Sequence, residues 1–160
     1  MKNINRFTVV VFLLVTPALH AGEPNHSQSN QEANKKTVTD FYELAFNQHK
    51  PTEAAKKYIG DKYIQHNPQV SNGAAAFYDY FEGFYKEHPK ANVKIYRAVA
   101  DADLVVLHLQ SKVDDKDLGR AVVDIFRLEN GKIVEHFDVA QSIPKKTANG
   151  NTMFEGSKAD

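Results

Sequence analysis

Three ionisable side chains interrupt apolar runs late in the sequence and could carry proton-transfer chemistry. Asp124 lies within RAVVDIFRLE, and His136 and Asp138 lie within KIVEHFDVAQ. The two stretches flank Asn130-Gly131, a dipeptide typical of tight hairpin turns, so we expect two antiparallel strands. His136 and Asp138 are two residues apart and should therefore point to the same face of the sheet.

The face on which Asp124 lies depends on the length of the turn. A two-residue turn places Asp124 opposite Phe137, on the face away from His136 and Asp138. A three-residue loop over residues 129–131 places Asp124 opposite His136, with Asp138 on the diagonal. The sequence allows both registers, and only the second gathers two carboxylates and an imidazole on one face.

A carboxylate in an apolar pocket loses water, which raises its pKa and makes Asp124 or Asp138 a usable general acid or base. His136 could orient that carboxylate or share its proton, and His66 and His108 are further proton carriers. The sequence has no Cys, no serine-nucleophile motif and no dinucleotide fingerprint, and no Lys lies mid-strand. The remaining reactions are cofactor-free proton transfers next to a carbonyl: aldol-type cyclisation, isomerisation, or hydration and dehydration.

Two other interpretations use the same residues. The first is a binding domain that holds a small ligand and catalyses nothing. The second is a metal site built from the five side chains named above, which are correct ligand types but have no local spacing motif. We therefore predict no resident metal and no cofactor, with a small molecule as ligand or substrate.

Composition indicates one globular domain and argues against nucleic acid as a partner. The 160 residues are 42% hydrophobic and 25% charged, with a formal net charge of zero. Residues 1–21 have the layout of a secretory signal peptide, with Lys2 and Arg6 before an apolar run from Phe7 to Val15 and a small residue, Ala21, at the expected cleavage site. The run is too short to span a bilayer, so we expect a secreted or periplasmic protein without a membrane span in its mature form.

Hydrophobic periodicity predicts helices first and a run of strands afterwards. A polar lead is expected over 22–33, the domain proper over 34–142, and a loop-like tail over 143–160. The expected helices are 32–49, 51–59 and 71–88, and the expected strands are 61–68, 92–100, 104–112, 119–128 and 132–142. This order predicts an α+β fold in which three helices pack on a strongly curved, mainly antiparallel sheet, as a cone with an open mouth. We expect the outer sheet face to carry Val105, Leu107, Val123 and Ile125 and to form a homodimer.

Three stretches resemble a known family. VDIFRLENGKIVEHFDVAQ is similar to the C-terminal hairpin of SnoaL-like polyketide cyclases, which belong to the nuclear transport factor 2-like superfamily. Residues 63–68 (YIQHNP) and 149–154 (NGNTMF) resemble a branch described as predicted aldol-condensation-catalysing proteins. The resemblance covers 34–154 and implies the same cone-shaped fold.

The resemblance also implies roles for individual residues. Asp138 matches the acid/base aspartate of the family's last strand, whereas Asp124 occupies a position where the polyketide cyclases carry a histidine. This departure argues against a polyketide substrate, though not against a pocket. His66 is implied to be a pocket residue, and we expect His108, Asn67 and Tyr63 to contact the substrate.

Overall fold

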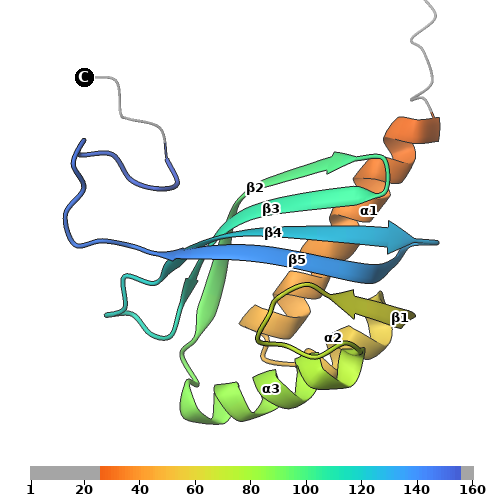
Figure 1. Cartoon of the computed structure of the whole chain (residues 1–160), viewed down its shortest axis with the longest axis horizontal. Coiled ribbons are helices and arrows are strands. Elements are labelled where there is room, and N and C mark those ends of the chain that lie inside the picture. Colours follow the sequence, from red (N-terminus) through yellow and green to blue (C-terminus); the bar gives the residue numbers. More distant parts are fainter. Residues whose placement is uncertain (1–25, 156–160) are drawn as a thin grey trace, which may run out of the picture.

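Residues 26–155, which this computed structural model describes, form three α-helices and one five-stranded sheet (Figure 1). The helices are α1 (His26–Tyr42), extended by a π-helical turn, η1 (Glu43–Asn47), then α2 (Pro51–Tyr58) and α3 (Ala74–Glu87). The strands are β1 (Ile59–Gln65), β2 (Asn92–Asp101), β3 (Leu104–Lys112), β4 (Arg120–Glu129) and β5 (Lys132–Ser142). The predicted signal peptide, 1–21, lies outside the described residues.

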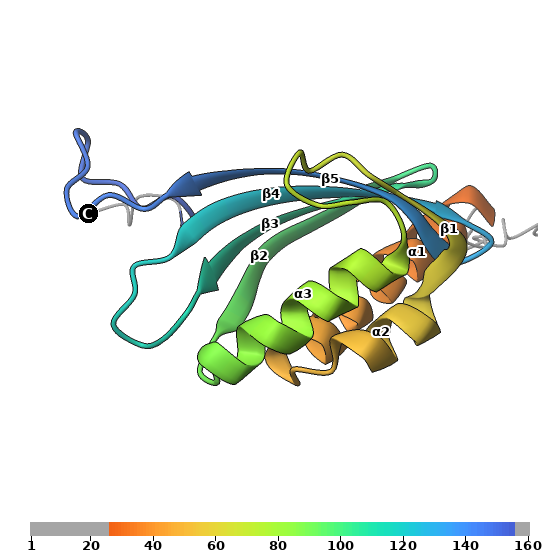
Figure 2. The same cartoon turned by 60° about the horizontal axis from the view of Figure 1, so that its bottom comes forward.

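The sheet has the strand order β1-β5-β4-β3-β2, in which only the β1–β5 pair is parallel. It curves over the three helices, which all lie on one side of it (Figure 2). The sheet does not close into a barrel. This arrangement confirms the predicted α+β fold with its mainly antiparallel sheet. No helix among the described residues is long and apolar enough to cross a membrane.

Helix α1 begins earlier than predicted, because residues 26–33, expected to be part of a polar lead, are helical. These turns have few apolar residues, so periodicity gave no signal for them. Their attachment is polar: Gln31 donates to the Asp101 carboxylate and Asn34 to the carbonyl of Ala102, at the turn between β2 and β3. The first amphipathic turn therefore marks where the helix reaches the core, not where it starts.

The core lies between the helices and the inner face of β3, β4 and β5. Its most deeply buried side chains are Val38, Phe41, Val105, Leu107, Leu109, Phe126 and Ile133. Val105 and Leu107 were expected on the outer face with Val123 and Ile125, and this part of the prediction was wrong. In the β3–β4 register, Val105 pairs with Phe126 and Leu107 with Asp124, so both point to the helices.

A register shift in β2 determines which of its side chains face the core. The pairing of β2 with β3 slips between Ile95 and Arg97, so Tyr96 is an extra residue in the strand. Simple alternation would have put Ile95, Arg97 and Val99 on one face. The bulge instead turns Ile95 towards the core and leaves Val99 outside, where 61% of its surface is exposed.

The tail folds back on the outer face of the sheet at the β2–β3 edge. Phe154 is buried there, and its ring stacks on those of Tyr96 and His108, with centroids 4.6 and 5.4 Å apart. The tail is therefore attached to the body of the domain through Phe154.

Candidate functional site

The hairpin formed by β4 and β5 brings the three predicted ionisable residues together by a register that neither sequence alternative contained. The turn has two residues, Asn130 and Gly131, both with positive φ (51° and 72°), as a twisted hairpin requires. Beyond it, the pairing slips by one residue at Val134 in β5. As a result, Asp124 pairs directly with Asp138.

The bulge at Val134 decides the chemistry of the inner face. Without it, the two-residue turn would place Glu135 and Phe137 inside and His136 outside. With it, Ile133 and Val134 are both buried in succession, and the alternation then continues with His136 and Asp138 facing inwards. Bulges commonly re-aim side chains next to functional sites.

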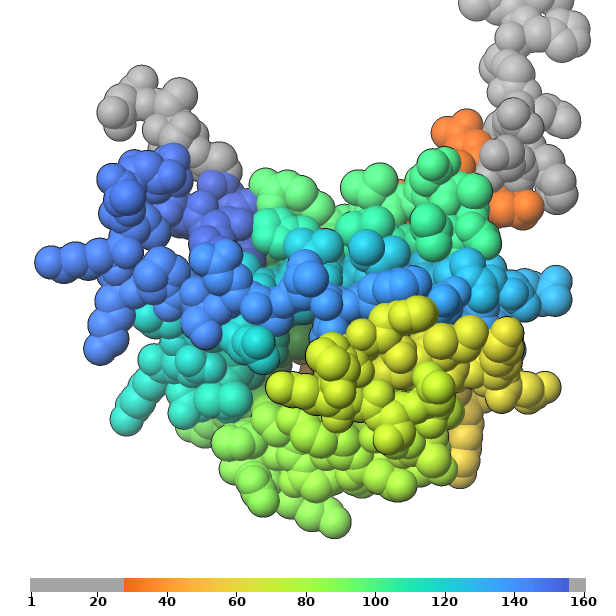
Figure 3. All heavy atoms as spheres, in the orientation of Figure 1, coloured from red at the N-terminus to blue at the C-terminus, as the bar shows by residue number. Residues whose placement is uncertain are grey.

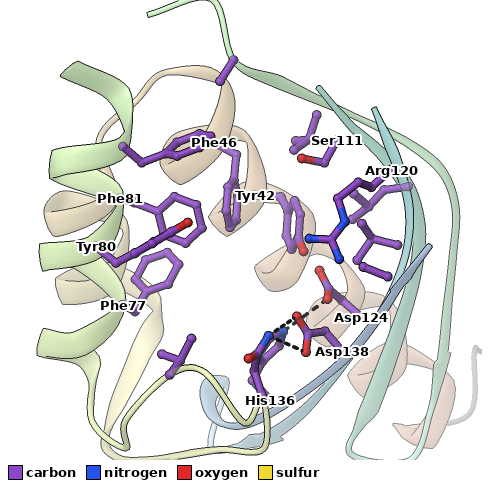
Figure 4. A pocket seen from close by; sticks show the side chains of 18 of the residues that line it. Tyr42, Phe46, Phe77, Tyr80, Phe81, Ser111, Arg120, Asp124, His136 and Asp138 are labelled. Atoms are coloured by element: carbon purple, nitrogen blue, oxygen red, sulfur yellow. Dashed lines mark hydrogen bonds and ion pairs between the residues drawn. The ribbon is translucent and has the colours of Figure 1, made fainter. Parts of the chain in front are cut away.

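These inward-facing groups line a cavity of about 580 Å³ between the sheet, α3 and the loop before α3. Its opening is visible as a hollow beside the β1–α3 loop in the space-filling view (Figure 3). One wall is aromatic and is built mainly by α3, and the opposite wall, on β4 and β5, carries the ionisable groups (Figure 4). The size is in the range of sites for drug-sized molecules.

Among residues 26–155, Asp124 is the one charged residue that is buried, with 4% of its surface exposed. Burial raises the pKa of its carboxyl group, an effect that the hydrogen bond from His136 partly opposes and the nearby charge of Asp138 reinforces. His136 Nε2 lies 3.3 Å from Asp124 Oδ1. One proton between these two atoms gives either a neutral pair or an ion pair, and both have no net charge.

Gln65, at the end of β1, sets which ring nitrogen of His136 carries a proton. Its Oε1 lies 2.9 Å from the backbone N of Asn67, a group that can only donate, so the atom must be the amide oxygen. The same oxygen lies 2.8 Å from His136 Nδ1, which must therefore hold a hydrogen. Nε2 is left to exchange a proton with Asp124.

Asn67 fixes the second carboxylate in a similar way. Its Oδ1 accepts from the backbone N–H of Gln69, which leaves Nδ2 as the group that faces Asp138. Nδ2 lies 2.9 and 2.7 Å from the two carboxylate oxygens of Asp138. Asp138 is thus held as an acceptor, with lone pairs still directed into the cavity.

Tyr63 also faces the cavity, next to Gln65, and its hydroxyl lies 3.5 Å from Gln65 Nε2. Burial raises the pKa of the Tyr63 hydroxyl, so the phenol stays protonated at neutral pH. Of the residues expected to contact the substrate, Tyr63 and Asn67 therefore do line the cavity.

Comparison with known proteins gives the family. The model of the SnoaL-like domain matches residues 38–136, more than half of the chain. The chain belongs to the SnoaL-like domain family. This family is part of the nuclear transport factor 2-like superfamily, so the resemblance of the C-terminal hairpin to SnoaL-like proteins is confirmed. No curated protein matches the chain.

Solved structures share the fold at low sequence identity. A SnoaL-like protein of unknown function from Burkholderia thailandensis is 16% identical, with a TM-score of 0.59 over 69% of this chain and 97% of that one. A protein proposed to be a polyketide cyclase from Bacillus cereus is 20% identical, with a TM-score of 0.60 over 74% and 80%. A protein proposed to be a ketosteroid isomerase from Kribbella flavida is 12% identical, with a TM-score of 0.59 over 74% and 84%.

Two predicted site residues of this SnoaL-like domain lie outside the cavity. His66 is on the outer face, where its ring stacks on Phe137 at 3.9 Å and its Nε2 lies 2.8 Å from Glu135. It follows Gln65 in the chain, and the alternation that turns Gln65 inwards turns His66 outwards. The expected position of His66 in the pocket was therefore wrong.

His108 is likewise on the outer face of β3, between the inward-facing Leu107 and Leu109. Its Nδ1 lies 3.0 Å from a guanidinium nitrogen of Arg97, and its ring packs against Phe154. Its predicted contact with a substrate in the cavity was wrong, for the same reason of strand parity.

The five-residue metal site considered from the sequence is thereby reduced to three residues. Asp124, His136 and Asp138 each offer one potential ligand atom, and these atoms all lie within 4.8 Å of one another. The set has the right donor chemistry for a divalent cation. However, these side chains already form hydrogen bonds with one another and with the amides of Gln65 and Asn67. Such a network is also what a proton-transfer site needs.

Sequence reasoning missed Gln65 and the aromatic wall as parts of the site. Gln65 had a weak signal, since it precedes the His-Asn-Pro element and shares a face with Tyr63. Two aromatic residues of α3, Phe77 and Tyr85, are buried. They also line the cavity, together with Tyr80, Phe81 and Phe84.

Proposed function

We propose that this SnoaL-like protein is a cofactor-independent enzyme that moves a proton at the carbon next to a carbonyl group of a small, largely apolar molecule. The observation that carries the proposal is the buried Asp124, hydrogen-bonded to His136 and paired with Asp138 on the wall of an apolar cavity. Structural neighbours proposed to be a polyketide cyclase and a ketosteroid isomerase agree with this class of chemistry.

The two carboxylates have environments that suit different roles. Asp138 accepts two hydrogen bonds from Asn67 and is the candidate base that removes the proton from carbon. Asp124 is buried with a raised pKa, so its neutral acid form is available to donate a proton to the carbonyl oxygen. The proton that leaves carbon goes to Asp138, and the proton that reaches oxygen comes from the Asp124–His136 pair, which yields a neutral enol.

The enol is the common intermediate of aldol-type cyclisation, isomerisation and dehydration. The resemblance of residues 63–68 and 149–154 to an aldol-condensation branch supports the first of these. The structure adds that Asn67, from the first stretch, contacts the candidate base directly. Phe154, from the second, packs on the outer face and supports the sheet rather than the cavity.

Hydrogen–deuterium exchange at the carbon next to the carbonyl of α-tetralone, followed by NMR in D₂O, tests the proposal without knowledge of the natural substrate. We expect Asp138→Asn and Asp124→Asn each to slow the protein-catalysed exchange by about 100-fold or more, the usual contribution of a general acid or base. Asp61→Asn, at an exposed carboxylate on β1, is the matched control and should leave exchange unchanged. Binding of the ketone without faster exchange would instead identify a non-catalytic ligand-binding domain.

We also propose that the mature protein acts outside the cytoplasm as a homodimer. Residues 1–21 support export, and a mature N-terminus at Gly22 in the periplasmic fraction, shown by mass spectrometry, would test it. The outer sheet face supports the dimer, because Val99 and Val139 are 61% and 68% exposed there and no helix of the described part covers them. Apolar patches of this kind commonly mark interfaces.

A further inference from the structure

The cavity contains a cation that the proposed proton transfer does not use. Arg120 begins β4, and its guanidinium points into the cavity from the same strand as Asp124 (Figure 4). Among residues 26–155, the Arg120 guanidinium makes no hydrogen bond or ion pair. In contrast, the guanidinium of Arg127, on the outer face of the same strand, bonds both Glu129 and Glu135. A guanidinium offers five donors in a planar fork, so its donors at this wall are available to a ligand.

The charges along the cavity favour an anion at this end. Arg120 and Lys112 are positive lining residues, and Asp138 is the carboxylate that opposes them. Asp124 and His136 lie within hydrogen-bond distance of each other, and with one proton between them the pair adds no net charge. Asp138 already accepts both hydrogen bonds of Asn67 Nδ2, which disperses its charge at the far end of the wall.

The spacing along β4 separates the α-carbon of Arg120 from that of Asp124, although its side chain extends along the wall towards Asp124 (Figure 4). Arg120 and Asp124 are four residues apart on one strand and share a face, so their α-carbons lie about 13 Å apart. Across the cavity, Phe77, Tyr80 and Phe81 form an apolar aromatic wall that faces the sheet. A ligand that fills this space has a charged group at one end, a ring system in the middle and a reacting carbon at the other end.

We propose that the substrate is an aromatic or polycyclic carboxylic acid, whose carboxylate is held by Arg120 while its carbonyl-bearing portion reaches Asp124 and Asp138. This inference rests on the proposed function, since it names the substrate class of the same cavity. A carboxylate matches the guanidinium fork in two parallel hydrogen bonds, and its single negative charge balances the one net positive charge of the cavity lining. Neutral ketones of the same shape would bind through the aromatic wall alone.

The test compares two probes of nearly equal shape, 2-naphthylacetate and 2-naphthylacetamide, by isothermal titration calorimetry. Because only the first is charged, we expect it to bind wild-type protein at least tenfold more tightly at low salt, and Arg120→Gln to abolish the preference. Lys112→Gln is the matched control, and it should keep most of the preference if Arg120 is the anchor. The preference should also shrink as salt rises, since Arg120 is exposed at the cavity wall.

Several results would overturn the inference. These are equal affinity of the two probes for wild-type protein, a preference that survives in Arg120→Gln, and no binding of 2-naphthylacetate at millimolar concentration. The outcome is separable from that of the proposed function. A charge preference without α-tetralone exchange would keep the ligand class and refute catalysis, and exchange without the preference would do the reverse.

Discussion

Replacement of Gln65 by Met tests whether β1 controls the protonation of the site. Met has a similar length but offers no carbonyl oxygen, so His136 Nδ1–H and the backbone N–H of Asn67 both lose their acceptor. With no acceptor at Nδ1, the imidazole is free to move its proton to Nε2. Nε2–H then donates to Asp124, which favours the carboxylate and removes the acid form that the proposed reaction uses.

The cost in stability follows from the two lost hydrogen bonds. The side chain of His136 is 13% exposed, and an unpaired buried donor costs about 1–3 kcal/mol. The Asn67 N–H is closer to the surface, and the net loss there is about 0.5–1.5 kcal/mol. We therefore expect a loss of about 2–4 kcal/mol, which lowers the melting temperature of a domain of this size by about 8 °C or more.

Long-range ¹⁵N–¹H spectra of histidine-labelled protein report the tautomer directly. We expect the Nδ1–H form of His136 in the wild-type protein and a shift towards Nε2–H in Gln65→Met. Gln141→Met, at an exposed position near the end of β5, is the matched control and should change neither the tautomer nor the melting temperature by more than about 1 °C. An unchanged His136 tautomer in Gln65→Met would refute the reasoning, even if stability falls.

Three further predictions address pH, turns and assembly. Because burial raises the native pKa of Asp124, the folded state binds the proton more tightly than the unfolded one, so wild-type stability falls as pH rises from the unfolded value of about 3.9 to the raised native pKa and is level above it. Thermal melts should show Asp124→Asn gaining stability relative to wild type across that window, and a constant difference from pH 3 to pH 8 would contradict this. Gly131→Ala should lower the free energy of unfolding by about 1 kcal/mol, because only the positive φ of this residue opposes a side chain. Gly119→Ala should lower it clearly more, since its Cβ would overlap a backbone carbonyl of β3. Denaturant titration compares the two variants, and equal losses would be inconsistent with this geometry. Val139→Glu should shift a homodimer to monomer in sedimentation velocity, while Asp61→Asn should not, and a wild-type monomer would remove the basis of the dimer proposal.

The sequence was sufficient for the order of elements and for the fold, because both depend on long periodic patterns. The aromatic stripe of α3 and the alternation of β3 predict a helix and a strand whatever their neighbours are. The Asn130-Gly131 turn was also predictable, since few dipeptides accept two positive φ values in succession. Together with the order of the elements, these local signals were enough to place three helices on one face of a sheet.

The site was less predictable, because it depends on register, and register in this sheet shifts in three strand pairs, β1–β5, β2–β3 and β4–β5, which strict alternation does not show. A signal for the bulge in β5 was present. Ile133 and Val134 are adjacent apolar residues, whereas polar and apolar residues alternate later in the strand, from His136 to Val139. A one-residue slip moves every later side chain to the other face. The bulge at Val134 therefore determines whether His136 points to the outer face or into the cavity, although Val134 takes no part in the proposed chemistry.

The same argument explains which histidines were misplaced. His66 was placed in the pocket by the family resemblance and His108 as a further proton carrier, and their neighbours Gln65 and Leu109 line the cavity instead. An imidazole on the outer face can stack and bond ions, as His66 does with Phe137 and Glu135, so its type alone does not indicate catalysis. Only the histidine brought inwards by a bulge meets a buried carboxylate. In this fold, the bulge at Val134 is thus the feature that converts an ordinary hairpin into a candidate acid/base site, because the same residues paired without a bulge would turn His136 and Asp138 out of the cavity.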